Sequence, residues 1–235
     1  MNTKTFLLYC CLFTATTLQA QQKWFSVFTD SAKLLKTANP ITTQFKKDIK
    51  KLQPNIRFNT DNIINTSPYL IYYGLNDHVN LPLWSQVIPP IKQFFTGVGG
   101  SPQEGEKIFG LFFNGFYLIH EYGHALQYMV DSAHTQLGYS NEYLANTIAI
   151  LWWRKNGKQA QLKACYDYAK KIYKQLPNPV PAGEDVATYF TKNYEKAASD
   201  PNVYGFMQWG QFITIYEDKS LPNFDTYIKN YLKKL

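Results

Sequence analysis

Residues 101–130 constrain the fold more than any other part of the sequence, because they have the pattern of one long, mostly buried helix. Ser101, Pro102 and Glu104 are arranged as a helix start, with a capping side chain followed by proline in the first turn. Apolar residues then recur at helical spacing: Ile108, Phe109, Phe112, Phe113, Phe116 and Ile119. Three glycines weaken this helix or allow it to bend: Gly105, Gly110 and Gly115. The pattern predicts a helix that runs into the sequence HEYGHALQYMV.

Two histidines lie four residues apart on this helix, with a glutamate directly after the first. At this spacing His120 and His124 project from the same face, so one nitrogen of each can reach a single metal ion. Glu121 points about 100° away around the helix and can lie beside a water on that metal without binding the metal itself. Buried without a partner, these polar groups would be costly. A zinc ion would compensate that cost, and Glu121 would then be the general base.

A zinc site that keeps one position for water needs a third protein ligand. Three residues downstream are candidates: Asp131, His134 and Glu142. Asp131 lies about 10 Å further along the helix than His124, too far to close a compact site. His134 can reach back only if the helix ends promptly. Glu142 begins a second helix that can lie against the first, so the sequence favours Glu142.

The second helix, expected over residues 141–155, is suited to close packing. Ala145 shares the face of Glu142, and Gly123 lies between the two histidines, so the two helix backbones can approach each other. Asn146 follows Glu142 by one turn and can hydrogen-bond the outer nitrogen of a ligand histidine, which fixes its tautomer. A second interpretation stays open, in which Glu142 only stabilises a helix N-terminus.

The rest of the chain predicts an α+β fold that is predominantly helical. β-prone runs occur only within residues 56–84, as YLIYYG and HVNLPLW, and either can supply an edge strand. Ser140 is a plausible cap for the second helix. Further helical patterns cover residues 30–54, interrupted or started at Pro40, and residues 159–176, and others begin near residues 184, 200 and 223.

The first twenty residues have the composition of a secretory signal peptide. Lys4 precedes a short apolar run, and cleavage is expected after Ala20. Residues 21–235 then form a single domain, which we expect to be secreted or periplasmic and without stable membrane insertion. Cys165 remains as the only cysteine of this domain, so its stability has to come from packing of an aromatic-rich core.

The chain is basic, but its charge does not indicate a nucleic-acid-binding protein. The formal net charge is +7 and becomes +6 when Lys4 leaves with the signal peptide. The lysines are spread along the chain and accompany no recognised nucleic-acid motif, so solvated helix faces explain most of them. A basic module that binds the cell envelope, with an HExxH that arose by chance, is one alternative interpretation.

HEYGH followed by NEYLAN resembles the gluzincin metallopeptidases, the thermolysin-like clan. The resemblance covers residues 120–146. It implies a zincin-like fold, with a helix that carries HExxH, a second helix that carries the glutamate and a small N-terminal β region. It also implies zinc, with His120, His124 and Glu142 as ligands and Glu121 as general base, and a peptide or protein as substrate.

The resemblance further implies a tyrosine or histidine that stabilises the oxyanion and lies after the HExxH helix. Tyr204 is the first choice, because it begins a well-capped helix with Gln208 one turn later, and the rest of that segment is aromatic. Tyr139 and His134 are the alternatives. The other function that remains open is a catalytically inactive zincin-like binding or scaffold protein. The oligomeric state has no signature in the sequence.

Overall fold

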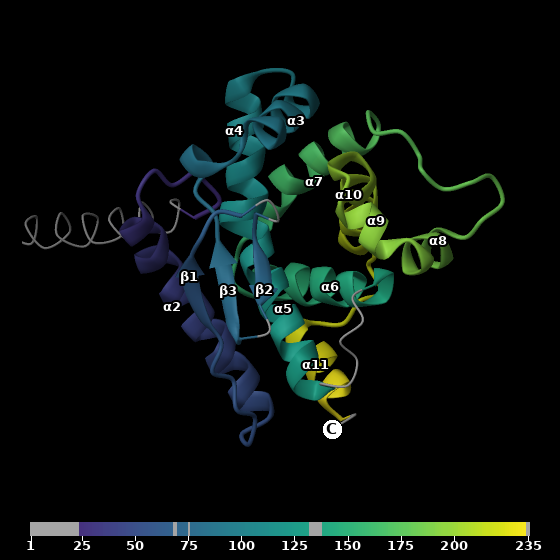
Figure 1. Cartoon of the computed structure of the whole chain (residues 1–235). Coiled ribbons are helices and arrows are strands. Elements are labelled where there is room, and N and C mark those ends of the chain that lie inside the picture. The colour runs from purple at the N-terminus through teal and green to yellow at the C-terminus, as the bar shows by residue number, and fades with distance from the viewer. Residues whose placement is uncertain (1–23, 68–69, 75, 132–137, 234–235) are drawn as a thin grey trace, which may run out of the picture.

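The computed structural model describes residues 24–67, 70–74, 76–131 and 138–233. Within these residues the fold is α+β and predominantly helical, with one small three-stranded sheet, as the sequence predicts (Figure 1). The expected signal peptide, residues 1–20, and the candidate His134 lie outside the described residues. No helix in the described part of the chain combines the length and apolar composition that crossing a bilayer requires.

The first helix, α2 (Ser31–Leu52), is continuous through Pro40. Its start is capped by Asp30, whose carboxylate accepts from the backbone N–H of Lys33 at 2.7 Å. Phe45 and Ile49 are fully buried on one face, so packing stabilises the part of the helix that follows Pro40. Of the two alternatives that the sequence leaves open at Pro40, a single helix is correct.

The sheet consists of β1 (Asp61–Ile64), β2 (Tyr72–Gly74) and β3 (His78–Leu81), in the order β1-β3-β2. Strand β1 is parallel to β3, whereas β2 is antiparallel to it, with Tyr73 opposite Val79. The expectation that HVNLPLW can supply an edge strand is therefore wrong, because β3 is paired on both sides. The run YLIYYG contains β2, which is an edge.

The predicted long helix is bent in the middle. Helix α3 (Pro89–Gly99) precedes it, and α4 (Pro102–Leu111) begins with the expected cap, in which Ser101 Oγ accepts from the backbone N–H of Glu104 at 3.2 Å. A π-helical turn, η2 (Phe112–Phe116), then leads into α5 (Tyr117–Val130). The backbone departs from helical geometry at Asn114, whose side chain is fully buried and donates to the carbonyl of Pro82 at 3.0 Å, just beyond β3.

In the described part of the second half, helices are the only secondary-structure elements, and loops join them. Its elements, with the short 3-10 helix that precedes α3, have these bounds: η1 (Trp84–Gln86), α6 (Tyr139–Lys155), α7 (Gln159–Tyr173), α8 (Val186–Lys192), α9 (Tyr194–Ala198), α10 (Pro201–Glu217) and α11 (Phe224–Leu232). Asp200 caps α10 as predicted, by accepting from the backbone N–H of Asn202 at 2.8 Å. The cap of α6 is Gly138 and not Ser140, which lies inside the first turn.

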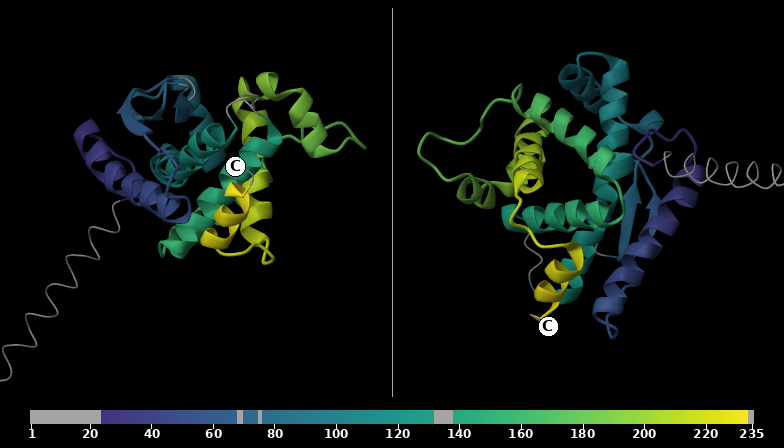
Figure 2. Two further views of the ribbon diagram at one scale, coloured as in Figure 1. Left: turned by 90° about the horizontal axis from the view of Figure 1, so that it is seen from below. Right: turned by 180° about the vertical axis from the view of Figure 1, so that it is seen from behind.

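Helices α5 and α6 lie in the middle of the molecule, with α2 and the sheet on one side and α7 and α10 on the other (Figures 1 and 2). Phe45 of α2 joins these parts, because its ring makes edge contacts with the rings of Tyr122 in α5, Trp152 in α6 and Phe224 in α11. Asp48, one turn later, is buried and accepts from the indole N–H of Trp152 at 3.1 Å. The core thus fixes α5 and α6 relative to each other.

Two glycines give a direct test of the crossing between α3 and α4. A β-carbon on Gly105 would lie 2.8 Å from the backbone of Phe95, whereas one on Gly97 would have no atom within 4 Å. We expect Gly105→Ala to lower the free energy of unfolding by about 1–3 kcal/mol, because the helices must separate. Gly97→Ala should raise it by about 1 kcal/mol through helix propensity alone. Urea unfolding measures both, and equal effects would contradict the close crossing.

Candidate metal centre

Helices α5 and α6 approach each other closely where they carry the motif residues. A β-carbon on Gly123 would lie 3.1 Å from the α-carbon of Ala145, so the two backbones are in contact at this position. The small residues at the crossing therefore do what the sequence predicts. Gly123 lies between the two histidines in α5, and Glu142 lies one turn before Asn146 in α6. The contact between the helices therefore brings the two histidines close to Glu142 and Asn146.

Three potential ligand atoms converge at this crossing. Nε2 of His120 lies 3.1 Å from Nε2 of His124, and the carboxylate Oε2 of Glu142 lies 3.1 Å and 3.4 Å from these two nitrogens. All three side chains are buried or nearly so, with His124 the most exposed at 10%. They form a group that could hold a metal ion.

The spacing of the three atoms fits a small tetrahedral cation. Nitrogen and oxygen ligands lie about 2.0–2.1 Å from zinc, so the corners of a tetrahedron around it are about 3.3 Å apart. The observed separations of 3.1, 3.1 and 3.4 Å match this value. Three protein ligands leave the fourth corner of such a tetrahedron to a small molecule.

A chain of amides determines which nitrogen of His120 carries the proton. Gln211 donates to the backbone carbonyl of Tyr139 at 2.9 Å, and Gln208 donates to the carboxylate of Glu142 at 2.6 Å, which fixes the orientation of both glutamine amides. Their carbonyl oxygens then accept the two N–H groups of Asn146, at 2.9 and 3.0 Å.

Asn146 consequently presents its own carbonyl oxygen to Nδ1 of His120, at 2.8 Å. Because an oxygen can only accept here, Nδ1 must carry the proton and Nε2 faces Glu142 and His124 with its lone pair. The predicted hydrogen bond between Asn146 and a ligand histidine is thus present. It leaves the lone pair of Nε2 of His120 available to a cation.

The electrostatics of the cluster favour a positive charge at its centre. Burial on its own raises the pKa of the Glu142 carboxyl, but the charge of His124 and the hydrogen bonds that both histidines donate when they are protonated hold this pKa well below its ordinary value. The pKa of His124 is raised in return, because the attraction of Glu142 outweighs the burial that lowers it. A buried carboxylate in contact with two imidazoles is therefore a group that could hold a cation.

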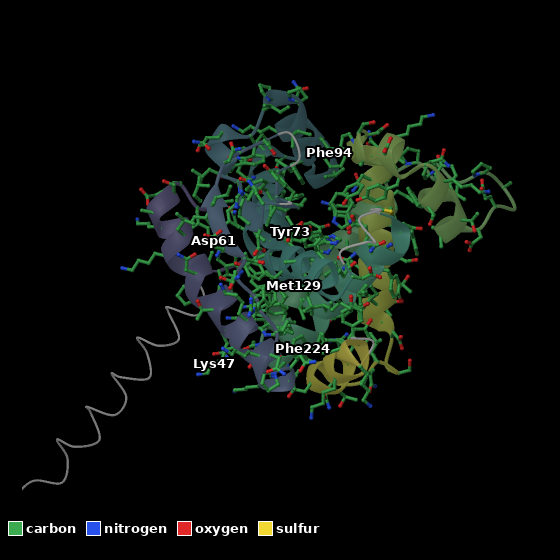
Figure 3. All side chains as sticks on the ribbon, turned by 60° about the horizontal axis from the view of Figure 1, so that its bottom comes forward. Lys47, Asp61, Tyr73, Phe94, Met129 and Phe224 are labelled. Atoms are coloured by element: carbon green, nitrogen blue, oxygen red, sulfur yellow. The ribbon has the colours of Figure 1, made fainter. Side chains whose placement is uncertain are left out.

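Glu121 is buried next to the edge strand. Its carboxylate accepts from the backbone N–H of Tyr73 in β2 at 2.8 Å, and Figure 3 shows Tyr73 near the middle of the molecule. Burial raises the pKa of Glu121, although the charges of His120 and His124 oppose this. The glutamate of the motif is thus held apart from the three converging atoms but within their electrostatic field.

Two tyrosines and a glutamine complete the surroundings of Glu142. Tyr204 donates to Oε1 at 3.1 Å and accepts from Gln208 at 2.9 Å, so the tyrosine chosen from the sequence lies in the cluster. Burial and the charge of Glu142 raise the pKa of Tyr204 well above its ordinary value, so it is a neutral donor. Tyr194 also donates to Oε1.

Sequence reasoning missed Tyr194 and Tyr117. Tyr117 precedes His120 by one turn of α5, and its ring lies against the imidazole with centroids 5.2 Å apart; its helical spacing from His120 was the available signal. No local pattern marks Tyr194, which reaches Glu142 from 52 residues further along the chain. Tyr139, an alternative donor, borders the amide chain through Gln211, and its ring stacks on those of Tyr143 and Phe190.

Comparison with known proteins identifies no relative of this chain. No family model, curated protein or solved structure matches the chain. The class of the site is therefore defined by its own residues, as a buried cluster of two histidines and one glutamate that could hold a metal ion.

Removal of one histidine tests the cluster directly. We expect His120→Ala to weaken zinc binding by at least about 100-fold, since it removes a ligand as well as the hydrogen bond to Asn146. His78→Ala is the matched control, because His78 is a half-buried histidine of β3 that lies outside the cluster. Competition with a chromophoric chelator measures both affinities. Equal zinc affinities in the two variants would contradict the assignment.

Proposed function

We propose that this protein is an exported zinc-dependent peptidase of the gluzincin type. In this proposal His120, His124 and Glu142 bind zinc, and Glu121 is the general base. The observation that carries it is the convergence of two imidazole nitrogens and one carboxylate oxygen at tetrahedral spacing. The edge strand, the HExxH helix and the glutamate-bearing helix together support a zincin-like fold.

The residues present fit the ion and leave it able to act as a catalyst. A zinc ion held by three ligands would polarise the scissile carbonyl and lower the pKa of a water molecule towards 7. His124 is the most exposed of the three ligand side chains, so we place the side open to substrate next to it. The buried side of the cluster is filled by Asn146, Gln208 and Gln211.

Glu121 is suited to moving the proton. As general base it takes a proton from the attacking water, and as general acid it returns that proton to the departing amine. The burial that raises its pKa makes its carboxylate a better base than an exposed glutamate. The N–H of Tyr73 keeps one carboxylate oxygen oriented, at 2.8 Å, while the other remains for the proton.

Two further elements have roles in this proposal. Tyr204 is the candidate donor to the oxyanion, since it is neutral and already lies within hydrogen-bonding distance of a ligand. Strand β2 is the candidate surface for an extended peptide: it is an antiparallel edge, and its Tyr73 contacts Glu121. A peptide paired with β2 would lie alongside the general base.

Export is part of the same proposal. Residues 1–20 are proposed to be a signal peptide that is cleaved after Ala20, which would release residues 21–235 as the active domain into the periplasm or the medium. Cys165 is buried and unpaired, with its pKa raised by burial, so the thiol is protected from oxidation outside the cell.

Glu121→Gln separates a peptidase from an inactive binding protein of the same fold. We expect hydrolysis of a peptide library by the mature protein, and a loss of about 10²–10⁴-fold in kcat for the variant, because the amide cannot accept the proton. Zinc content, measured by elemental analysis, should stay at one equivalent. A wild-type protein that binds zinc but cleaves no peptide would favour the scaffold alternative.

Tyr204→Phe tests the donor. The variant removes one hydroxyl and is expected to lower kcat by about 10²–10³-fold with little change in KM, since an oxyanion donor acts mainly in the transition state. Tyr139→Phe is the matched comparison, because Tyr139 is the alternative donor, its ring stacks on Tyr143 and Phe190, and its neighbour in the network is Gln211. If Tyr139→Phe loses activity and Tyr204→Phe does not, the roles are reversed.

A further inference from the structure

Glu142 accepts hydrogen bonds from protein side chains on both of its carboxylate oxygens. Three side chains donate to it: Tyr194 at the start of α9, and Tyr204 and Gln208 in α10. Its side chain is only 2% exposed, so bulk water contributes little to holding it. The donors come from two elements that are distant in sequence from α5, which carries the histidines.

The two oxygens of Glu142 have different surroundings. Oε2 lies within 3.4 Å of both imidazoles and accepts from Gln208 at 2.6 Å. Oε1 is turned to the phenols and accepts from Tyr194 and Tyr204. The oxygen that carries both phenolic hydrogen bonds is thus not the one that converges with the histidines.

We propose that Tyr194 and Gln208 are positioning residues that hold Glu142 as a one-oxygen ligand of the metal. This inference rests on the metal site proposed above and concerns its coordination number. A carboxylate that is free to rotate can bind through both oxygens and take up a further coordination position. With Oε1 held by Tyr194 and Oε2 by Gln208, rotation breaks hydrogen bonds that no solvent replaces.

The position of Tyr194 makes it suited to this task. It belongs to the segment α8–α9, on the opposite side of the molecule from α2 (Figure 1), and its ring makes an edge contact with that of Tyr204, with centroids 6.3 Å apart. Both hydroxyls donate to Oε1. Tyr194 therefore keeps Oε1 hydrogen-bonded if Tyr204 turns to a substrate, so positioning and catalysis fall on different tyrosines.

Cobalt(II) provides a test that does not depend on activity. Its visible absorption bands are intense when the ion has four ligands and weaker when it has five. We expect the wild-type protein to bind one equivalent with the intense bands. Tyr194→Phe and Gln208→Met should each bind Co²⁺ about 10–100-fold more weakly, and with the weaker bands, because each loses one of the hydrogen bonds that oppose rotation of the carboxylate.

Tyr189→Phe is the matched control, since Tyr189 is a half-buried tyrosine on the same segment whose ring packs against Phe190. It should bind Co²⁺ with the affinity and spectrum of the wild type. Circular dichroism of each metal-free variant checks that it is folded, and the two substitutions at separate helices keep the test open if one fails this check. The proposal is overturned if the folded variants retain the wild-type spectrum, with or without a loss of affinity.

Failure of the proposed function has a different signature. If the wild-type protein binds no Co²⁺, the metal site itself is wrong and the positioning role falls with it. If the wild type binds one equivalent and the folded Tyr194→Phe and Gln208→Met proteins have its spectrum, the metal site stands and only the positioning role is wrong.

Discussion

The contact between α5 and α6 at Gly123 and Ala145 is the constraint on which the site depends. Imidazole and carboxylate side chains are short, so two histidines from one helix and a glutamate from another can meet only where the backbones nearly touch. A β-carbon at Gly123 would already lie 3.1 Å from the α-carbon of Ala145. The ring of Phe45 stabilises this crossing, because it contacts Tyr122 in α5 and Trp152 in α6.

The polar side chains around the cluster determine how His120 is oriented and protonated. Buried amides are stable only when every donor and acceptor is paired, and α10 satisfies this through Gln208 and Gln211, whose oxygens accept from Asn146. The same bonds decide that Asn146 accepts from His120, so its lone pair is directed inward. Helix α10 thus sets the tautomer of a histidine in α5 through the side chain of Asn146 in α6. Hydrogen bonds thus connect the two glutamines of α10 with Asn146, His120 and Glu142 in one network.

Much of the fold and part of the site could be predicted from the sequence. The HExxH spacing, the choice of Glu142 over Asp131 and the role of Asn146 follow from helix geometry, because residues one turn apart share a face whatever surrounds them. The glycines of this helix allowed a bend, but the sequence could not place it at Asn114, whose side chain donates to the carbonyl of Pro82, 32 residues away. The role of Tyr194 could not be predicted either, because its hydrogen bond to Glu142 joins residues 52 positions apart and a single tyrosine in a short helix has no periodic pattern.

The sequence by itself determined which residues of a helix share a face and where most helices begin. It also determined that His120, Glu121 and His124 need polar or charged partners when they are buried. Local rules suffice for this, because capping and periodicity act over three or four residues. Only the tertiary structure decided that β2 is the edge strand beside Glu121, that α10 orients His120, and that both phenols face one oxygen of Glu142. These are contacts between distant segments, and packing of the whole core selects them.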